Sequence, residues 1–260
     1  MPDATADVLH AERVTKRFGA LTAVNDVTWR LRENEIAGII GSNGAGKTTF
    51  FNLLTGYYPP DDGVIRFRGR DITDLSAEQR VGLGLMRTFQ LTSTFDNLTV
   101  VDNLVLAWYR ANRPASLWQL LRHRRDRYRR EPAILEALDT FELAPLADRL
   151  VSHLGLGEKR RVEIAMAVVT EPGVLLLDEP LAGLSESEIR GVLTVLRKRI
   201  GRQTILIVEH KISHVEDFLQ RLTVMHEGRV IADGSYEECL RHPEVRRSYW
   251  QIADDATETA

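Results

Sequence analysis

The residues best suited to chemistry form one short segment near the N-terminus. Residues 41–48 read GSNGAGKT, which matches the pattern Gly, four residues, Gly, Lys, then Ser or Thr. Glycines at these positions let successive backbone amides turn toward phosphate oxygens, and a lysine and a hydroxyl can meet phosphate charge and magnesium. At this composition about 0.003 matches are expected by chance. The segment therefore predicts a loop that binds the phosphates of a nucleotide.

The expected contacts extend over the whole loop and the first turn of the helix that follows it. The residues that we expect to contact the nucleotide are Ser42, Asn43, Gly44, Ala45, Gly46, Lys47, Thr48 and Thr49. Lys47 would neutralise phosphate charge, and the Thr48 hydroxyl would bind magnesium. An apolar strand before the loop and a helical pattern after it supply the positive helix end that favours anions.

Two carboxylates follow a run of four apolar residues. Asp178 and Glu179 come directly after residues 174–177, which read VLLL and are typical of a strand buried on both faces. Ligands of parallel sheets gather at the carboxyl ends of strands. We expect Asp178 to hold magnesium and Glu179 to orient an attacking water molecule. An Asp-Glu pair at a strand end is common by itself. We assign these roles to it because the chain also contains the phosphate loop.

The elements around these residues predict an α/β fold. Strands and turns dominate residues 8–90, where the pattern predicts antiparallel strands over 8–14 and 27–31, further strands over 35–40, 64–67 and 85–89, and a helix over 46–54. Ser76 and Gln79 predict a capping box. Strands over 174–177 and 204–208 alternate with helices over 186–200 and 211–219, which indicates a parallel sheet with crossover helices. A hairpin over 221–232 and a final helical stretch follow.

Residues 99–169 instead have helical periodicity, so we expect a helical subdomain inserted into the α/β core. The predicted organisation is one domain, with a core over about 8–90 and 170–252 and a helical subdomain over about 91–169. Residues 253–260 are predicted to form a frayed tail.

Composition excludes several classes of function. The chain has 260 residues, with 34 Lys and Arg against 37 Asp and Glu, a net charge of −3 that does not favour nucleic acid as a partner. Its single cysteine, Cys239, excludes an internal disulfide and a cysteine-based zinc site. No apolar run approaches the ~18 residues that span a bilayer. We expect a protein on the cytoplasmic side, for which other chains would provide any membrane-spanning segments.

These motifs, in this order, resemble the ATP-binding subunits of ABC transporters over about residues 9–250. The resemblance implies a P-loop NTPase core with an antiparallel β subdomain, ATP and Mg²⁺ as ligands, and ATP hydrolysis as the reaction. Phe18 is at the position of an aromatic residue that stacks on adenine. Gln90 matches a glutamine that meets magnesium, water and the membrane partner, and His210 matches a histidine at the γ-phosphate. Plain core packing is the alternative for Phe18.

The family's signature segment, Leu-Ser-Gly-Gly-Gln, completes the ATP site of the opposite subunit. Here the matching residues 154–158 read LGLGE. Gly155 replaces the serine, Gly157 matches a glycine of the family, and Glu158 stands in place of the glutamine. One charge-assisted hydrogen bond to phosphate would be missing. A second departure is Ser185, where the family loop after the catalytic glutamate ends in Asp or Asn. Both departures concern what this chain offers to a partner's nucleotide.

Finer resemblance indicates the subgroup that serves branched-chain amino acid importers, through residues 18–24, 87–90 and 159–165. It implies permease subunits, a second ATPase subunit in a heterodimer or a homodimer, an extracytoplasmic solute-binding protein and a peripheral position on the cytoplasmic membrane face. Two alternatives stay open: an exporter ATPase of the lipopolysaccharide type, and a nucleotide-gated protein outside transport. The basic residues 122–130 predict a solvated helix face or a contact with anionic lipid or an acidic partner loop.

Overall fold

The computed structural model describes residues 7–88, 94–112, 128–209 and 218–249. The chain divides into two compact units, of which the first comprises residues 1–85 and 201–260 and the second comprises residues 86–200. The sequence predicts a helical subdomain over about 91–169 alone. Residues 170–200 belong to the same compact unit as this segment. The boundary of the helical subdomain at residue 169 stays a prediction.

An antiparallel sheet in the first unit confirms the predicted β subdomain. Its strands, in the order β2-β1-β4-β5, are β1 (Asp7–Phe18), β2 (Leu21–Arg32), β4 (Asp62–Phe67) and β5 (Arg70–Asp71). Strands β1 and β2 are longer than the sequence predicted. Arg13 and Asp26 take left-handed φ angles of 52° and 51°, and the β1–β2 register shifts around them. These bulges interrupt the alternation of apolar residues and end the sequence signal early.

The second sheet of the first unit is mainly parallel, as predicted. Its strands follow the order β10-β9-β3-β8 and are β3 (Ile36–Ile40), β8 (Thr204–Val208), β9 (Arg221–His226) and β10 (Arg229–Gly234). β3 pairs in parallel with both β8 and β9, and β9 and β10 form the predicted antiparallel hairpin. Every residue of β3 and β8 is buried, which explains their continuous apolar sequences.

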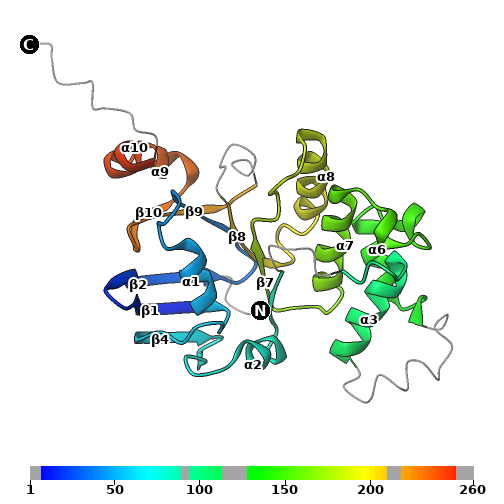
Figure 1. Cartoon of the computed structure of the whole chain (residues 1–260), viewed down its shortest axis with the longest axis horizontal. Coiled ribbons are helices and arrows are strands. Elements are labelled where there is room, and N and C mark those ends of the chain that lie inside the picture. The colour runs from blue at the N-terminus through cyan, green and yellow to red at the C-terminus, as the bar shows by residue number, and fades with distance from the viewer. Residues whose placement is uncertain (1–6, 89–93, 113–127, 210–217, 250–260) are drawn as a thin grey trace, which may run out of the picture. The chain divides into compact units, whose positions relative to one another are not determined.

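Short helices follow the strands of the first unit. They are α1 (Lys47–Leu54), α2 (Ala77–Gly82), α9 (Tyr236–Arg241) and α10 (Pro243–Tyr249). Ser76 and Gln79 form the predicted capping box at the start of α2. Helices α9 and α10 lie together and contact β10 (Figure 1). Of the helix predicted over 211–219, residues 211–217 lie outside the described residues.

Arg80 fixes the C-terminal end of α1. Its guanidinium, with 1% of the residue exposed, donates to the carbonyl oxygens of Leu53 (2.6 Å), Leu54 (2.8 Å) and Thr73 (2.9 Å). Helix ends leave such carbonyls without intrahelical partners. Burial lowers the pKa of Arg80 to about 10, so the group remains charged at neutral pH. The helix that begins at Lys47 is thereby held at its far end.

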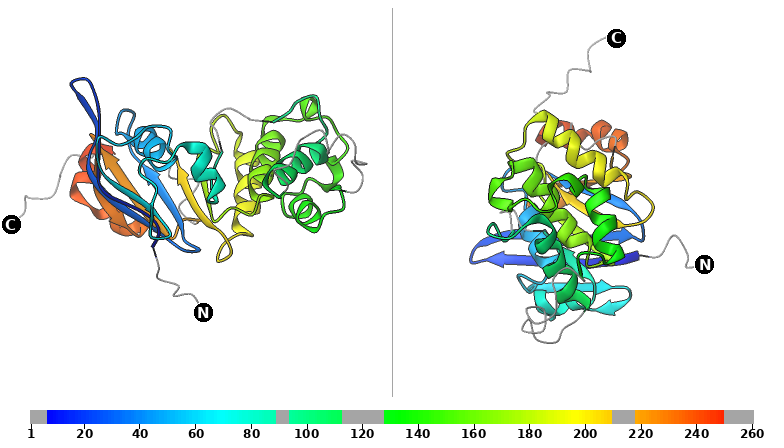
Figure 2. Two further views of the ribbon diagram at one scale, coloured as in Figure 1. Left: turned by 90° about the horizontal axis from the view of Figure 1, so that it is seen from below. Right: turned by 90° about the vertical axis from the view of Figure 1, so that its right-hand side faces the viewer.

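The second unit pairs two strands with a group of helices. Strands β6 (Leu85–Arg87) and β7 (Val174–Asp178) are neighbours in a sheet. The helices are α3 (Val100–Asn112), α6 (Pro132–Thr140), α7 (Leu156–Val168) and α8 (Glu186–Arg197), with 3-10 turns at Ala144–Leu146 and Val151–His153. Helices α3, α6 and α7 pack against one another (Figure 2). The predicted helical insertion is thus confirmed as part of an α/β fold.

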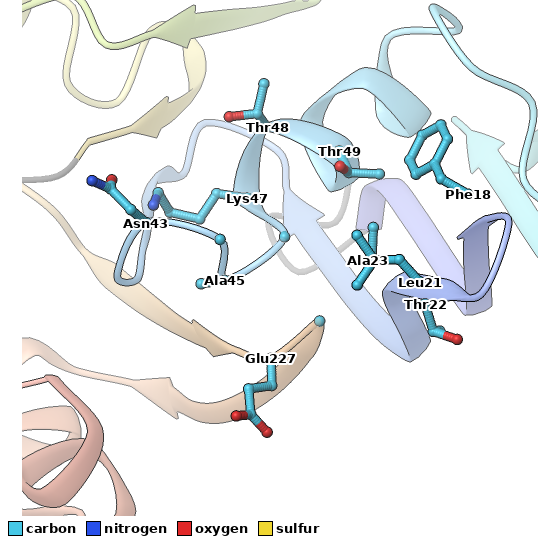
Figure 3. A pocket seen from close by; sticks show the side chains of 13 residues that line it. Phe18, Leu21, Thr22, Ala23, Asn43, Ala45, Lys47, Thr48, Thr49 and Glu227 are labelled. Atoms are coloured by element: carbon cyan, nitrogen blue, oxygen red, sulfur yellow. The ribbon is translucent and has the colours of Figure 1, made fainter.

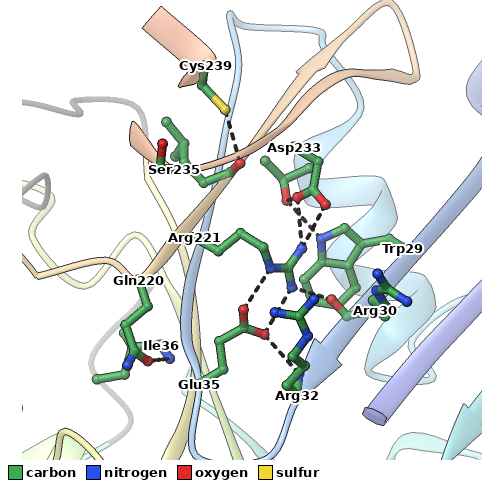
Figure 4. A network of polar contacts seen from close by, with 12 residues as sticks. Trp29, Arg30, Arg32, Glu35, Ile36, Gln220, Arg221, Asp233, Ser235 and Cys239 are labelled. Atoms are coloured by element: carbon green, nitrogen blue, oxygen red, sulfur yellow. Dashed lines mark hydrogen bonds and ion pairs between the residues drawn. The ribbon is translucent and has the colours of Figure 1, made fainter. Parts of the chain in front are cut away.

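A buried polar network joins β2, β3, β9 and β10 in the first unit (Figure 4). The Arg221 guanidinium donates to Glu35 Oε1 (2.8 Å), to Asp233 Oδ1 (2.8 Å) and to the Arg30 carbonyl. Burial alone would raise the pKa of Glu35, but hydrogen bonds from Arg221 and from the Arg32 amide outweigh it and lower the pKa. In the adjoining layer, burial raises the pKa of the Cys239 thiol to about 11. The thiol is therefore protonated at neutral pH.

We predict that Arg221→Met destabilises the protein by about 3–5 kcal/mol at pH 7, because it leaves the Glu35 carboxylate buried without its cation. Urea unfolding measures the loss, with Arg241→Met, at an exposed ion pair, as the control. The lowered pKa of Glu35 means that its contribution is present above about pH 4.5 and is lost at lower pH. The difference between the two proteins should therefore shrink in acid. An equal loss of stability at pH 7 and in acid below about pH 4.5 would contradict the role assigned to the Glu35–Arg221 pair.

Candidate functional site

A pocket of about 630 Å³ lies in the first unit (Figure 3). Three segments form its wall: the turn between β1 and β2, the loop before α1 with the first turn of that helix, and the turn between β9 and β10. The lining residues are Phe18, Leu21, Thr22, Ala23, Asn43, Gly44, Ala45, Gly46, Lys47, Thr48, Thr49, Glu227 and Gly228. The pocket thus brings Phe18 together with the loop residues 43–49. Of the predicted contact residues in the loop, Ser42 is outside this set.

Lys47 is the first residue of α1 and is 4% exposed. Its Nζ donates to the carbonyl oxygens of Gly41 (2.7 Å) and Ser42 (3.0 Å), so the ammonium group lies inside its own loop. Gly46 precedes it with φ 95°, and a Cβ there would come within 2.3 Å of the Ala23 carbonyl. Only glycine fits this turn. The sequence therefore folds into a cradle with a cation at its centre.

The electrostatics at the start of α1 suit an anion. No acidic residue lies in the first turn of α1, and its N-cap residue, Gly46, has no side chain that could cap the first amides. These amides and the helix dipole leave partial positive charge at the pocket wall. With the Lys47 ammonium, the arrangement can bind a phosphate group.

Phe18 lies at the end of β1 and is 44% exposed. Its ring meets Tyr58 edge to face at 5.5 Å between centroids, and Lys16 Nζ lies 5.8 Å from its centroid. The alternative of core packing does not describe a ring this exposed. An exposed aromatic ring at a pocket wall can stack on a flat ligand. Its role toward adenine stays a prediction.

We predict that Phe18→Ala weakens ATP affinity by about 5–150-fold, the equivalent of about 1–3 kcal/mol for a base stacked on an aromatic ring. Stability should change by less than about 1 kcal/mol, because Phe18 is 44% exposed and is not one of the buried core residues. ATP titration and thermal melting of the same samples separate these effects. Phe95→Ala, at a ring 54% exposed, is the control. A large melting loss with unchanged affinity would show that Phe18 supports the fold instead.

The turn Glu227-Gly228 is a part of the pocket that the sequence did not reveal as a site. The sequence predicts a hairpin turn at these residues and no contact with a ligand. The Gly228 amide donates to the Ala45 carbonyl (3.0 Å), and the Asn25 amide donates to the Gly228 carbonyl (2.8 Å). These bonds join three segments far apart in the sequence. The Glu-Gly dipeptide signalled a turn, but nothing in its spacing pointed to residues 43–49.

Asp178 and Glu179 lie in the second unit, at the carboxyl end of β7. Asp178 is 2% exposed, and Arg87 Nη2 donates to its Oδ2 at 2.7 Å. Glu179 follows with φ 46° and 9% exposure. A left-handed backbone is uncommon for glutamate and is often found at functional sites. The two carboxylates therefore stand at a strand end that suits ligand binding.

The segment 154–158 also lies in the second unit. Gly155 is the N-cap of α7 and supplies no side chain to its first amides. The Glu158 carboxylate instead accepts from the Gly155 amide (2.9 Å), and the Gly157 amide donates to Glu188 Oε1 (2.9 Å). The segment thus forms the start of α7, and two carboxylates bind its amides.

Two of the three residues expected to bind magnesium lie among the described residues. Thr48 lies at the pocket of the first unit and Asp178 in the second, whereas Gln90 lies outside the described residues. His210, which is expected at the γ-phosphate, also lies outside them. Within the described ranges, no three His, Cys, Asp or Glu side chains gather into a metal site. Hydroxyl and carboxylate oxygens are ligands that Mg²⁺ accepts, usually in small number together with phosphate oxygens. These residues fit that pattern.

Two sequence features concern membranes. In the part of the chain that the structure describes, no helix combines the length and apolar composition needed to cross a bilayer. Of the basic run 122–130, residues 122–127 lie outside the described residues. Arg129 donates to Asp148 (2.7 Å) and Asp102 (3.2 Å), so its guanidinium contacts two other segments of the second unit.

Comparison with known proteins gives consistent matches. The family model "ABC transporter" matches residues 24–182. The branched-chain amino acid transport ATP-binding protein LivG of Salmonella typhimurium is 39% identical over 238 residues, covering 90% of this chain and 93% of LivG. The lipopolysaccharide export ATP-binding protein LptB of Haemophilus influenzae is 35% identical, covering 93% and 96%. The ADP conformation of MJ1267, an ATP-binding cassette of an ABC transporter, superposes with a TM-score of 0.79 at 29% identity, covering 95% and 100%.

Proposed function

The chain belongs to the ABC transporter family of ATP-binding cassettes, which are ATPases, and from this premise we propose that it drives an importer of branched-chain amino acids or a related small solute. The observation that carries the proposal is the pocket in which Phe18 and residues 43–49 meet, in a chain 39% identical to LivG over 90% of its length. A pocket of this kind suits a nucleotide, and the relative indicates what its hydrolysis would drive.

In the proposed site, Phe18 stacks on adenine while the loop amides and Lys47 hold the β- and γ-phosphates. Thr48, Asp178 and Gln90 would hold Mg²⁺, which neutralises phosphate charge when bound. Glu179 orients the attacking water and accepts its proton. His210 would contact the γ-phosphate.

We further propose that two cassettes act together, on the cytoplasmic face of the membrane, with permease subunits and indirectly with an extracytoplasmic solute-binding protein. Gly155, Gly157 and Glu158 of one cassette would serve the nucleotide of the other. Because Gly155 lacks a hydroxyl, a sister ATPase with an intact signature would give a heterodimer with one complete site. Closure and reopening of the pair would move the permease helices.

We predict that Gly155→Ser raises the ATPase activity of the chain alone by about tenfold, the size of one added charge-assisted hydrogen bond. A Cβ at this position meets only Glu158 Oε2 at 3.9 Å, so the site has room for a serine. The stimulation should be weaker in complex with a sister ATPase. A steady-state assay measures both. If the wild-type chain alone is already fully active and the substitution changes nothing, Gly155 is a tolerated variant.

The similarity to LptB favours one further candidate, an exporter ATPase. A nucleotide-gated protein outside transport is a third, and the glutamate that follows β7 argues against it. The decisive experiment purifies the tagged chain from detergent-solubilised membranes and identifies the permease that accompanies it. The complex is then reconstituted with its solute-binding protein in lipid vesicles, and ATP-dependent uptake of labelled leucine, isoleucine and valine is measured.

Uptake that requires ATP and disappears with Lys47→Ala would support the importer. ATPase activity that responds to lipopolysaccharide, without uptake of amino acids, would favour the exporter. Co-purification with no membrane protein would favour the nucleotide-gated candidate.

A further inference from the structure

Glu188 joins the start of α7 to the start of α8 within the second unit. Its Oε1 accepts a hydrogen bond from the Gly157 amide at 2.9 Å. Its Oε2 accepts from the Ser185 amide at 2.9 Å and from the Ser185 hydroxyl at 2.7 Å. One carboxylate therefore binds both a residue of the signature segment and the serine that departs from the family pattern.

The same side chain covers Gly157. Gly157 is buried, and a Cβ at this position would lie 2.7 Å from Glu188 Cγ and 2.9 Å from Oε1. No other residue type fits beneath Glu188 in this arrangement. The Gly157 amide belongs to the first turn of α7, where amides have no intrahelical acceptor. Its hydrogen bond to Glu188 therefore occupies a donor that would otherwise be open to an anion.

The charge of Glu188 matters as much as its position. Hydrogen bonds from the Ser185 hydroxyl, the Ser185 amide and the Gly157 amide lower its pKa, so the group is ionised at neutral pH. A phosphate oxygen that approaches the Gly157 amide meets a negative charge already bound there. Because two anions cannot share one N–H donor at short range, one must leave.

We propose that Glu188 is a positioning residue that occupies the Gly157 amide and must withdraw before the terminal phosphate of ATP, bound to a second cassette, can reach it. The inference rests on the proposed function, in which residues 155–158 serve a partner's nucleotide. The ligand class is a nucleoside triphosphate, because the proposed function places residues 155–158 at the terminal phosphate of the partner's ATP. Glu188 then opposes pairing of the cassettes until ATP is present.

The test compares Glu188→Gln with Glu186→Gln in the full chain. Glu186 lies in the same first turn of α8, with a side chain 77% exposed that pairs with Arg190 at 3.7 Å. Both substitutions remove one charge from the start of the helix, but only one changes the contact to Gly157. ATPase rates over a range of ATP concentrations give KM and kcat. The affinity for ADP, which has no third phosphate, is measured alongside.

Glu188→Gln is expected to lower the KM for ATP by about three- to tenfold through loss of like-charge repulsion, with little change in kcat. Glu186→Gln should leave the KM unchanged, and neither variant should change ADP affinity. An unchanged or raised KM in Glu188→Gln would overturn the proposal. Failure of the wild-type chain to bind ADP or ATP would instead overturn the proposed function.

A second measurement does not depend on turnover. Amide hydrogen exchange of Gly157, followed by NMR in the nitrogen-15-labelled full chain, should be at least about tenfold faster in Glu188→Ala than in the wild type. The bond to Glu188 is the protection that the helix itself cannot provide. Equal exchange rates in the two folded proteins would show that Glu188 does not hold this amide, and would overturn the proposal by a separate route.

Discussion

The Lys47→Ala variant is expected to lose at least about 100-fold in ATP affinity while it keeps its fold. The Nζ of Lys47 lies among the Gly41 and Ser42 carbonyls, at the centre of the loop that lines the pocket. Charge-assisted hydrogen bonds to phosphate contribute about 1.5–3 kcal/mol each, and the ammonium can make two. Isothermal titration with ATP, in parallel with thermal melting, measures both quantities.

Two comparison variants make this result specific. Lys47→Met keeps most of the buried stem but not the charge, so it should lose the same affinity as Lys47→Ala. Lys198→Ala removes a lysine with 45% side-chain exposure in the second unit and should leave ATP affinity unchanged. Retention of ATP binding within about threefold of wild type in Lys47→Met would contradict the role of the ammonium group.

The parts of the fold predicted correctly are those with local causes. The cradle before α1 requires glycine at position 46, and the capping box at Ser76 involves residues three positions apart. The hairpin of β9 and β10 turns at Glu227-Gly228, where both residues have positive φ. In each case the residues that determine the structure are neighbours in the sequence, so their types are sufficient to predict it.

The parts that were missed depend on distant partners. Glu35 and Arg221 form a buried ion pair although 186 positions separate them. Arg80 is charged, which predicts exposure, yet it is buried because it binds the end of α1. Glu188 contacts Gly157 across 31 positions and also binds Ser185, so the sequence did not show that the signature segment and Ser185 share one carboxylate. Such contacts follow from the packing of whole elements and have no local signal.

Glu179→Gln is expected to reduce ATP turnover by about 10²–10⁴-fold, the usual contribution of a general base. ATP affinity should stay within about threefold of wild type, because the amide keeps the size of the side chain and Lys47 is untouched. Turnover is measured in the assembled transporter complex, and retained ATP is quantified after gel filtration. The variant should elute with intact ATP, whereas the wild type should elute with ADP or empty.

A control for the backbone is available in the same unit. Glu171 has φ 51°, close to the 46° of Glu179, and is exposed at the end of a different turn. If glutamine disturbed the protein merely because it occupies a left-handed position, Glu171→Gln would lose a comparable amount of stability in thermal melting. We expect normal activity from Glu171→Gln, which would assign the loss at position 179 to the carboxylate. Near wild-type turnover in Glu179→Gln would show that another residue activates the water, because a glutamine amide cannot accept the proton of that water.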